Sequence, residues 1–165
     1  MPTYVLDEYR ADIPRNAVLV DTNILSARFL PRDDFHIEAS YFLDTVPSIL
    51  VPLCVIGEAW GIVNSRARSA APAIEMLRWV STPGTVTVVR DDEHLSSRSN
   101  ELCSNLGIDY VDAMLMLLAD KLSRECLGRR IKIATLDTRD FYRLMRARTH
   151  QFELCDMRSW DGDDL

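Results

Sequence analysis

The sequence predicts an α/β protein, a three-layer α/β/α sandwich around a mostly parallel central sheet. Two observations carry this prediction. Strand-like and helix-like segments alternate along the chain from residue 17 onward. The first apolar run, residues 17–20, also lacks the apolar–polar alternation of a half-exposed strand, which is typical of parallel strands that helices cover on both faces.

The boundaries of the expected elements follow from punctuating residues and from composition. Pro72 starts a helix, and β-branched residues dominate the stretch 85–89 after a Pro-Gly turn, so that stretch is expected to be a strand. Gly107 separates two helices, and Gly128 ends the second of them. In chain order we expect a strand at 17–21, a helix at 35–45, a strand at 49–53, helices at 55–66 and 72–80, a strand at 85–89, helices at 92–105 and 109–126, a strand at 131–136, a helix at 139–146 and a strand at 151–155.

One domain accounts for most of the chain, since 165 residues suffice for a single core. We expect this domain to span residues 17–158, with an N-terminal extension at 1–16 and a disordered acidic tail at 159–165. No apolar stretch approaches the ~20 residues of a membrane span. No basic segment precedes an apolar run at the N-terminus, so no secretory signal is expected. These features predict a cytoplasmic protein without a membrane partner.

The charge distribution bears on a nucleic-acid partner in two opposite ways. The net charge of −6 counts against one, because such domains are usually basic on one face. Arginine, which suits bidentate phosphate contacts, nevertheless makes up 17 of the 19 basic residues. Arg139, Arg143 and Arg146 recur at helical spacing, so we expect this face to bind nucleic acid. The alternative is a solvated helix face whose arginines pair with acids such as Asp140.

Four acidic residues stand where the chain changes from strand to helix. Asp21 and Asp137 follow predicted strands, and Glu58 and Asp112 fall in the predicted first turns of helices. Carboxyl ends of parallel strands share one edge of a sheet, where ligands bind. Carboxylates gathered there repel one another, by roughly 4 kcal/mol per pair at ~4 Å and an effective dielectric of about 20. A divalent cation offsets that repulsion, so the sequence predicts a Mg²⁺ or Mn²⁺ site.

Each of these acids also has a purely structural explanation. Asp21 begins an Asp-Thr-Asn turn or cap, Asp137 can cap the next helix, and Asp112 follows Asp109 in a capping arrangement. Glu58 is the hardest to explain in this way. Its neighbours are apolar residues of a core-facing helix stripe, where an acid needs a partner or a metal.

Other catalytic chemistries have less support. The chain has no GxxxxGK[ST] phosphate loop and no GxSxG elbow. Position 23 is Asn, whereas a phosphoaspartyl hydrolase of the haloacid dehalogenase type needs a second acid there. The three histidines are scattered at no metal-ligand spacing. A nucleophile supplied by the protein is therefore not expected.

Four segments together resemble the PIN-domain family, and most closely the VapC-type toxin ribonucleases. They are residues 18–25, 55–60, 109–115 and 134–141, which carry the motifs VLVDTNIL, VIGEAW, DYVDAML and ATLDTRDF. Any one motif is weak. Four of them in the family's order, with the acids separated by 37, 54 and 25 residues, are specific.

The resemblance implies a metal-dependent endoribonuclease that cleaves single-stranded or structured RNA with a metal-activated water, together with a protein antitoxin and a homodimer. The implied catalytic metal ligands are Asp21, Glu58, Asp112 and Asp137. The resemblance adds Asp140 as a further metal ligand, and Asn23 and Thr135 as supports of the site. Two alternatives stay open: a PIN nuclease for RNA processing or DNA without an antitoxin, and a catalytically silent PIN-like binding module. The four intact acids weigh against the silent module.

Overall fold

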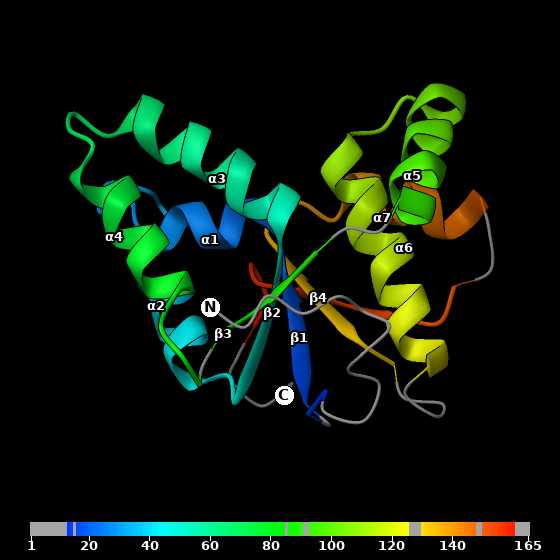
Figure 1. Ribbon diagram of the computed structural model, residues 1–165, viewed down its shortest axis with the longest axis horizontal. Helices are drawn as coiled ribbons and strands as arrows, with labels where there is room; N and C mark the ends of the chain where they lie inside the picture. The colour runs from blue at the N-terminus through cyan, green and yellow to red at the C-terminus, as the bar shows by residue number, and fades with distance from the viewer. Residues whose placement is uncertain are drawn as a thin grey trace.

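The computed structural model describes residues 13–14, 16–84, 86–90, 93–125, 130–147 and 150–160. Within these ranges the chain alternates between strands and helices (Figure 1). The elements are β1 (Ala17–Val20), α1 (Thr22–Arg28), α2 (His36–Thr45), β2 (Ser48–Pro52), α3 (Leu53–Arg66), α4 (Ala71–Val80), β3 (Val86–Val89), α5 (Glu93–Leu106), α6 (Tyr110–Glu125), β4 (Lys132–Thr135), α7 (Arg139–Ala147) and β5 (Glu153–Asp156).

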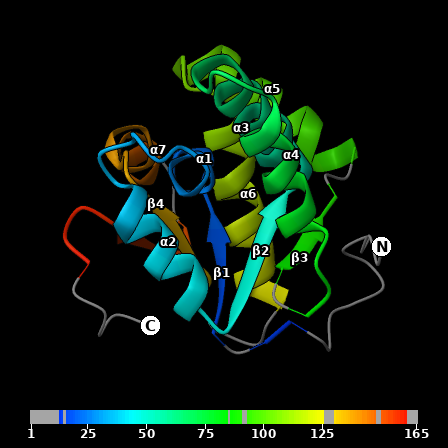
Figure 2. The same cartoon turned by 90° about the vertical axis from the view of Figure 1, so that its left-hand side faces the viewer.

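The strands form one parallel sheet in the order β3-β2-β1-β4-β5. Helices α1–α4 cover one face of this sheet and α5–α7 cover the other, as the two perpendicular views show (Figures 1 and 2). The direction of chain progression reverses after β3, because α5 and α6 carry the chain back to the far side of β1. The expected three-layer α/β/α sandwich with a parallel sheet is therefore confirmed.

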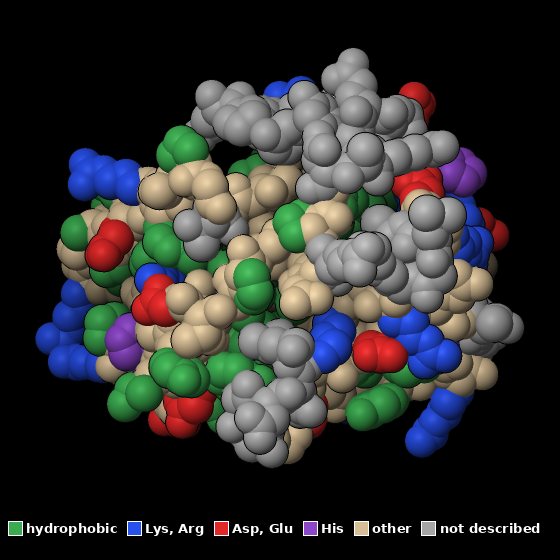
Figure 3. All heavy atoms as spheres, turned by 90° about the horizontal axis from the view of Figure 1, so that it is seen from below, with side chains coloured by type: hydrophobic (Ala, Val, Ile, Leu, Met, Phe, Trp, Pro, Cys, Tyr) green, Lys and Arg blue, Asp and Glu red, His purple; other side chains and the backbone are tan. Residues whose placement is uncertain are grey.

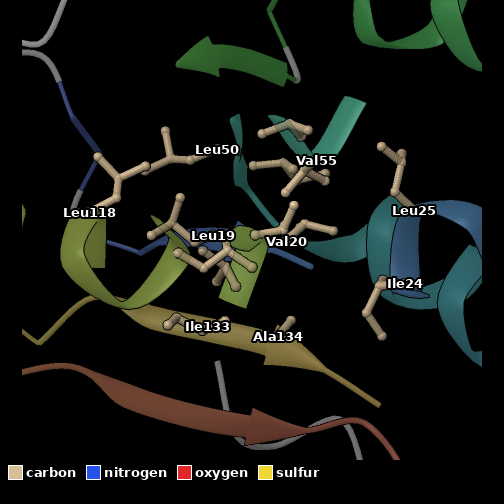
Figure 4. Packing of buried hydrophobic residues seen from close by; sticks show 14 of the residues in the cluster. Leu19, Val20, Ile24, Leu25, Leu50, Val55, Leu118, Ile133 and Ala134 are labelled. Atoms are coloured by element: carbon tan, nitrogen blue, oxygen red, sulfur yellow. The ribbon is translucent and has the colours of Figure 1, made fainter. Parts of the chain in front are cut away.

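The core explains why β1 is apolar throughout. All four of its residues are buried, and Leu19 pairs in register with Leu50 of β2 on one side and Ile133 of β4 on the other. Figure 4 shows these side chains packed together with Leu118 of α6 and with residues of α1. A strand covered on both faces has no polar side to present, so apolar–polar alternation is absent.

All eleven expected elements are present, with bounds that differ by one or two residues. One helix was not expected. The sequence suggested a turn or a cap at Asp21, and the structure continues from that cap into α1. The Asp21 carboxylate accepts a hydrogen bond from the backbone N–H of Thr22 at 2.6 Å, which satisfies an otherwise orphaned donor at the helix start.

Residues 1–12 and 161–165, which carry most of the expected extension and tail, lie outside the described residues. Among the described helices, none combines the length and the apolar composition that crossing a bilayer requires. Figure 3 shows the end of the molecule where the strands begin. Acidic side chains are scattered there among basic and apolar ones. A gathering of acids is found at the opposite end of the sheet.

Candidate functional site

A cleft of about 610 Å³ opens at the carboxyl ends of the strands, and the four predicted acids line it together. It lies where the sheet order reverses, between the end of β1 and the end of β4, which is where ligands bind in open α/β sheets. Among the described residues three further acids also line the cleft, so its walls are strongly anionic. The lining acids are Asp21, Asp33, Asp34, Glu58, Asp109, Asp112 and Asp137.

Asp21 is the most deeply placed of the four, with only 5% of its surface exposed. It directly follows β1 and caps α1, so its side chain is fixed from both sides. Besides the Thr22 N–H, its carboxylate accepts hydrogen bonds from Asn23 Nδ2 at 2.8 Å and from the Thr135 hydroxyl at 2.6 Å. A buried carboxylate needs such donors, because it has lost the hydrogen bonds of water.

The two predicted support residues join the ends of β1 and β4. The Asn23 side-chain oxygen accepts a hydrogen bond from the backbone N–H of Leu136 at 3.0 Å. The Thr135 hydroxyl accepts from the backbone N–H of Asp137 at 3.0 Å while donating to Asp21. Asn23 and Thr135 therefore both contact Asp21, and both hold the loop that carries Asp137.

Glu58 lies deeper into its helix than the sequence suggested. The prediction placed it in a first turn, but α3 begins at Leu53, directly after β2, and its first turn contains no acid. The partner of Glu58 is Thr22, whose hydroxyl donates to Oε2 at 2.6 Å. Thr22 was not predicted from the sequence, although its place beside Asp21 in the Asp-Thr-Asn motif was the available signal.

Asp112 lies in the first turn of α6, as expected. The expected capping arrangement is also present, since the Asp109 side chain accepts a hydrogen bond from the backbone N–H of Val111 at 2.8 Å. Asp109 itself lines the cleft beside Asp112. Asp109 therefore caps the start of α6 and lines the acidic cleft at the same time.

Burial and mutual repulsion raise the pKa of two of the acids. Burial is the larger cause for Asp21, whose pKa rises from 3.8 to about 6; Glu58 adds to the rise, and the Thr135 and Thr22 hydrogen bonds oppose it. The pKa of Asp112 rises from 3.8 to about 8, through burial first and then through the charges of Asp21, Asp109, Asp140 and Glu58. A bound cation would reverse both effects, because it favours the ionised carboxylates.

Asp137 and Asp140 differ from the deeper acids. Asp137 is 59% exposed and accepts a hydrogen bond from the backbone N–H of Arg139 at 3.1 Å, so it also has the capping role considered from the sequence. Asp140 is on α7 and does not line the cleft, although its charge reaches Asp112. The Arg139 guanidinium lies 3.5 Å from Asp137 and 4.0 Å from Asp140.

The three arginines of α7 are exposed, and none of them lines the cleft. The basic side chains that do line it are Arg32 and Arg66, which sequence analysis missed. Arg66 had a signal. It follows Glu58 by eight residues on α3, which is close to two helical turns, and so shares a helix face with it. Arg32 precedes two aspartates in an irregular segment and had none.

Among the residues that the structure describes, no three Asp, Glu, His or Cys side chains are gathered closely enough to form a preassembled metal cage. The donor chemistry nevertheless fits a hard divalent cation. The cleft offers carboxylate oxygens from several elements, and Mg²⁺ takes one or two carboxylates while keeping several waters. Burial is the main cause of the raised pKa values of Asp21 and Asp112, and neighbouring carboxylates add a repulsion that such a cation would relieve.

Comparisons with known proteins agree with this architecture. Residues 18–147 match the PIN domain family. No curated protein sequence matches the chain. Among solved structures, the chain is similar to the sarcin–ricin loop cleaving toxin VapC20 of Mycobacterium tuberculosis, with 20% identity, a TM-score of 0.65, and coverage of 77% of this chain and 94% of that one.

Two further structures are similar. One is a toxin–antitoxin complex from Klebsiella pneumoniae, with 22% identity, a TM-score of 0.54, and coverage of 75% of this chain and 89% of that one. The other is VapBC2 from Rickettsia felis bound to a promoter DNA fragment, with 14% identity, a TM-score of 0.53, and coverage of 84% and 97%. At these identities the likeness establishes the fold, and the family match extends over most of the chain. The chain therefore belongs to the PIN domain family.

Proposed function

We propose that this protein is a divalent-metal-dependent endoribonuclease that cleaves single-stranded RNA and acts as the toxin of a toxin–antitoxin pair. The observation that carries the proposal is the gathering of four motif acids on one cleft of a PIN domain. The solved structures that support it include a toxin described as cleaving the sarcin–ricin loop. Two others are a toxin–antitoxin complex and VapBC2 bound to a promoter DNA fragment, which supports an antitoxin partner.

Within this proposal Asp21, Glu58, Asp112 and Asp137 hold Mg²⁺ or Mn²⁺, directly or through water, and Asp140 contributes its charge from α7. When bound, such a cation lowers the pKa of a water molecule and neutralises charge that develops on the phosphate. The protein's own residues position the carboxylates. Thr135 and Asn23 fix Asp21, and Thr22 fixes Glu58.

The reaction is a hydrolysis, in which a water oxygen forms a bond to phosphorus and the phosphodiester's bond to its leaving oxygen breaks. A protein nucleophile is not needed, which agrees with the absence of serine or histidine motifs in the sequence. The proposal also includes RNA contacts by Arg139, Arg143 and Arg146, a cytoplasmic location and a homodimer. The arginine contacts follow from the charge pattern, the homodimer from the family resemblance, and the location from the sequence features described above.

The test is cleavage of labelled single-stranded RNA and of single-stranded DNA of the same sequence, in Mg²⁺, in Mn²⁺ and in EDTA. We expect RNA cleavage that requires metal, with little cleavage of DNA. Comparable cleavage of DNA would favour a processing or DNA nuclease. Absence of cleavage of both in either metal, for protein that is folded by circular dichroism, would favour the silent binding module.

A further inference from the structure

The cleft that carries the acids extends to a wall of different chemistry. The residues that line this part of the cleft are Ser26, Arg32, Phe35 and Arg66. Both arginines also line an adjoining pocket of about 370 Å³, whose remaining walls are mostly apolar and include Arg68. The acidic cleft and this pocket therefore share a rim of two arginines and one acid, Arg32, Arg66 and Asp33.

The buried hydroxyl of Ser26 is evidence for a ligand at this wall. It is 3% exposed, and its hydroxyl finds no hydrogen-bond partner among the described residues. Ser26 lies one helical turn after Thr22 on α1, and Thr22 reaches Glu58 from the same helix face. Buried hydroxyls are nearly always hydrogen-bonded, so this hydroxyl is available to a group that enters the cleft.

The arginine Arg66 is similarly available. It stands in the last turn of α3 with 65% of its side chain exposed, and its contact with Asp33 is long, at 4.0 Å. The Asp33 carboxylate is held by its other oxygen, since Oδ1 accepts a hydrogen bond from the backbone N–H of Phe35 at 3.1 Å while Oδ2 faces Arg66. Arg66 can therefore offer its planar donors to a phosphate, which it matches bidentately.

These groups select the chemistry of the ligand. Guanidinium groups suit a phosphate, a half-buried aromatic ring suits a planar base, and a lone buried hydroxyl suits a polar base edge or a ribose hydroxyl. A nucleotide of a single strand carries all three features. Resting on the proposed nuclease function, we propose that Ser26, Arg32, Phe35 and Arg66 form a nucleotide subsite that holds the RNA next to the scissile phosphate. The strand continues past Arg68.

The test measures binding separately from cleavage. Anisotropy of a fluorescently labelled single-stranded RNA of mixed sequence is followed in EDTA across a salt series, for the wild type and for Arg66→Gln and Ser26→Ala. Arg130→Gln is the matched control for Arg66, because its side chain is 66% exposed and lies 3.7 Å from Glu153, at the end of the sheet away from the cleft. Ser99→Ala controls for loss of a buried hydroxyl on α5.

We expect Arg66→Gln to weaken binding and to flatten the log–log salt dependence by roughly 0.7, the value for one lost single-strand phosphate contact. Ser26→Ala should raise the Kd about fivefold, the usual effect of one hydrogen bond, with an unchanged slope. Both controls should bind as the wild type does. Circular dichroism of every variant confirms that each one is folded.

Three outcomes overturn the subsite. If the wild type binds and cleaves RNA but Arg66→Gln and Ser26→Ala behave as it does, the subsite is wrong while the proposed function stands. If the wild type neither binds nor cleaves RNA, both fail together. If poly-glutamate displaces RNA as effectively as unlabelled RNA does, an acidic protein segment is the better assignment for this wall.

Discussion

The Thr135 hydroxyl donates a hydrogen bond to Oδ2 of Asp21 over 2.6 Å, and so joins residues that stand 114 positions apart in the sequence. The bond connects the end of β4 with the residue that follows β1, two strands that lie side by side in the sheet. It also lowers the pKa of Asp21, against the effect of burial. Thr135 is therefore placed to position this carboxylate and to keep it ionisable.

Replacing Thr135 tests this positioning role. Thr135→Val keeps the shape but leaves a buried carboxylate short of a donor, which should cost about 1–3 kcal/mol of stability. It should also raise the pKa of Asp21 further and shift the pH profile of RNA cleavage to higher pH. Thr135→Ser retains the hydroxyl and should restore both. Equal damage from the serine variant would assign the effect to the lost methyl group instead.

Removing single carboxylates tests the proposed metal ligands. We expect Asp21→Asn, Glu58→Gln and Asp112→Asn each to lower RNA cleavage by ~100-fold or more. Mutating a residue that only hydrogen-bonds to a metal ligand already lowers metal affinity or activity by about 10–100-fold. Stability without metal should hold or rise, because repulsion within the cleft falls. Cleavage assays and thermal melting in EDTA measure the two effects. Glu101→Gln, an exposed site on α5, is the control, and full activity in two of the three variants would contradict the assignment.

Metal binding should be visible without any substrate. A cation that binds only the folded protein stabilises it by about 2.7 kcal/mol at 100 times its Kd. For a domain of this size that corresponds to several degrees in Tm. We expect Mn²⁺ and Mg²⁺ to raise the Tm of the wild type, and Asp21→Asn to lose most of the gain. A Tm that millimolar metal leaves unchanged in both proteins would favour the silent binding module.

The raised pKa values predict how stability depends on pH when metal is absent. Folded Asp21 and Asp112 hold protons that the unfolded chain releases, since their pKa values rise from 3.8 to about 6 and about 8. This contribution is complete below pH 3.8 and is lost as pH rises through about 6 for Asp21 and about 8 for Asp112. Melting in EDTA should therefore show the wild type losing stability relative to Asp112→Asn up to about pH 8. Parallel curves for the two proteins would refute the shift at Asp112.

Metal affinity should change with pH in the opposite direction, because cations bind the ionised carboxylates. The increase in Tm caused by Mn²⁺ should grow over the same range, from pH 3.8 to about 8. The two trends have one cause, namely the loss of protons from the cleft. A metal effect that is constant over this range would place the cation away from Asp112.

The arginines of α7 provide a separate test of RNA binding. Arg139 is exposed and close to Asp137 and Asp140, and Arg143 is exposed one turn further along the helix. We expect neutralising both to weaken RNA binding and to flatten its log–log salt slope by roughly 0.7 per lost contact. Turnover at saturating RNA should change much less. Slopes identical to that of the wild type would show that this face is only solvated, with Arg139 serving its neighbouring acids.

Much of the architecture could be predicted from local pattern. The uniformly apolar β1, the β-branched β3 and the glycine between α5 and α6 could each be predicted from the local sequence, because strand burial and helix termination depend on a few neighbouring residues. The order of strands and helices then limits the sheet to a parallel one. The first turn of α6 was predictable in the same way, since Asp109 caps it through a bond to Val111. Helix α1 was missed because a cap and a turn have the same local sequence, Asp-Thr-Asn.

The sequence by itself determined the family motifs and the strand ends that carry Asp21 and Asp137, because a parallel sheet brings its carboxyl ends to one edge. Only the tertiary structure decided which side chains share the cleft. In the structure Arg32 and Arg66 line the cleft and Asp140 does not. Thr22 is the hydrogen-bond partner of Glu58. The physical reason is the short range of the interactions that form the site. Hydrogen bonds and charges act over a few ångströms in space, and the distance between Asp21 and Thr135 is set by the packing of β1 against β4.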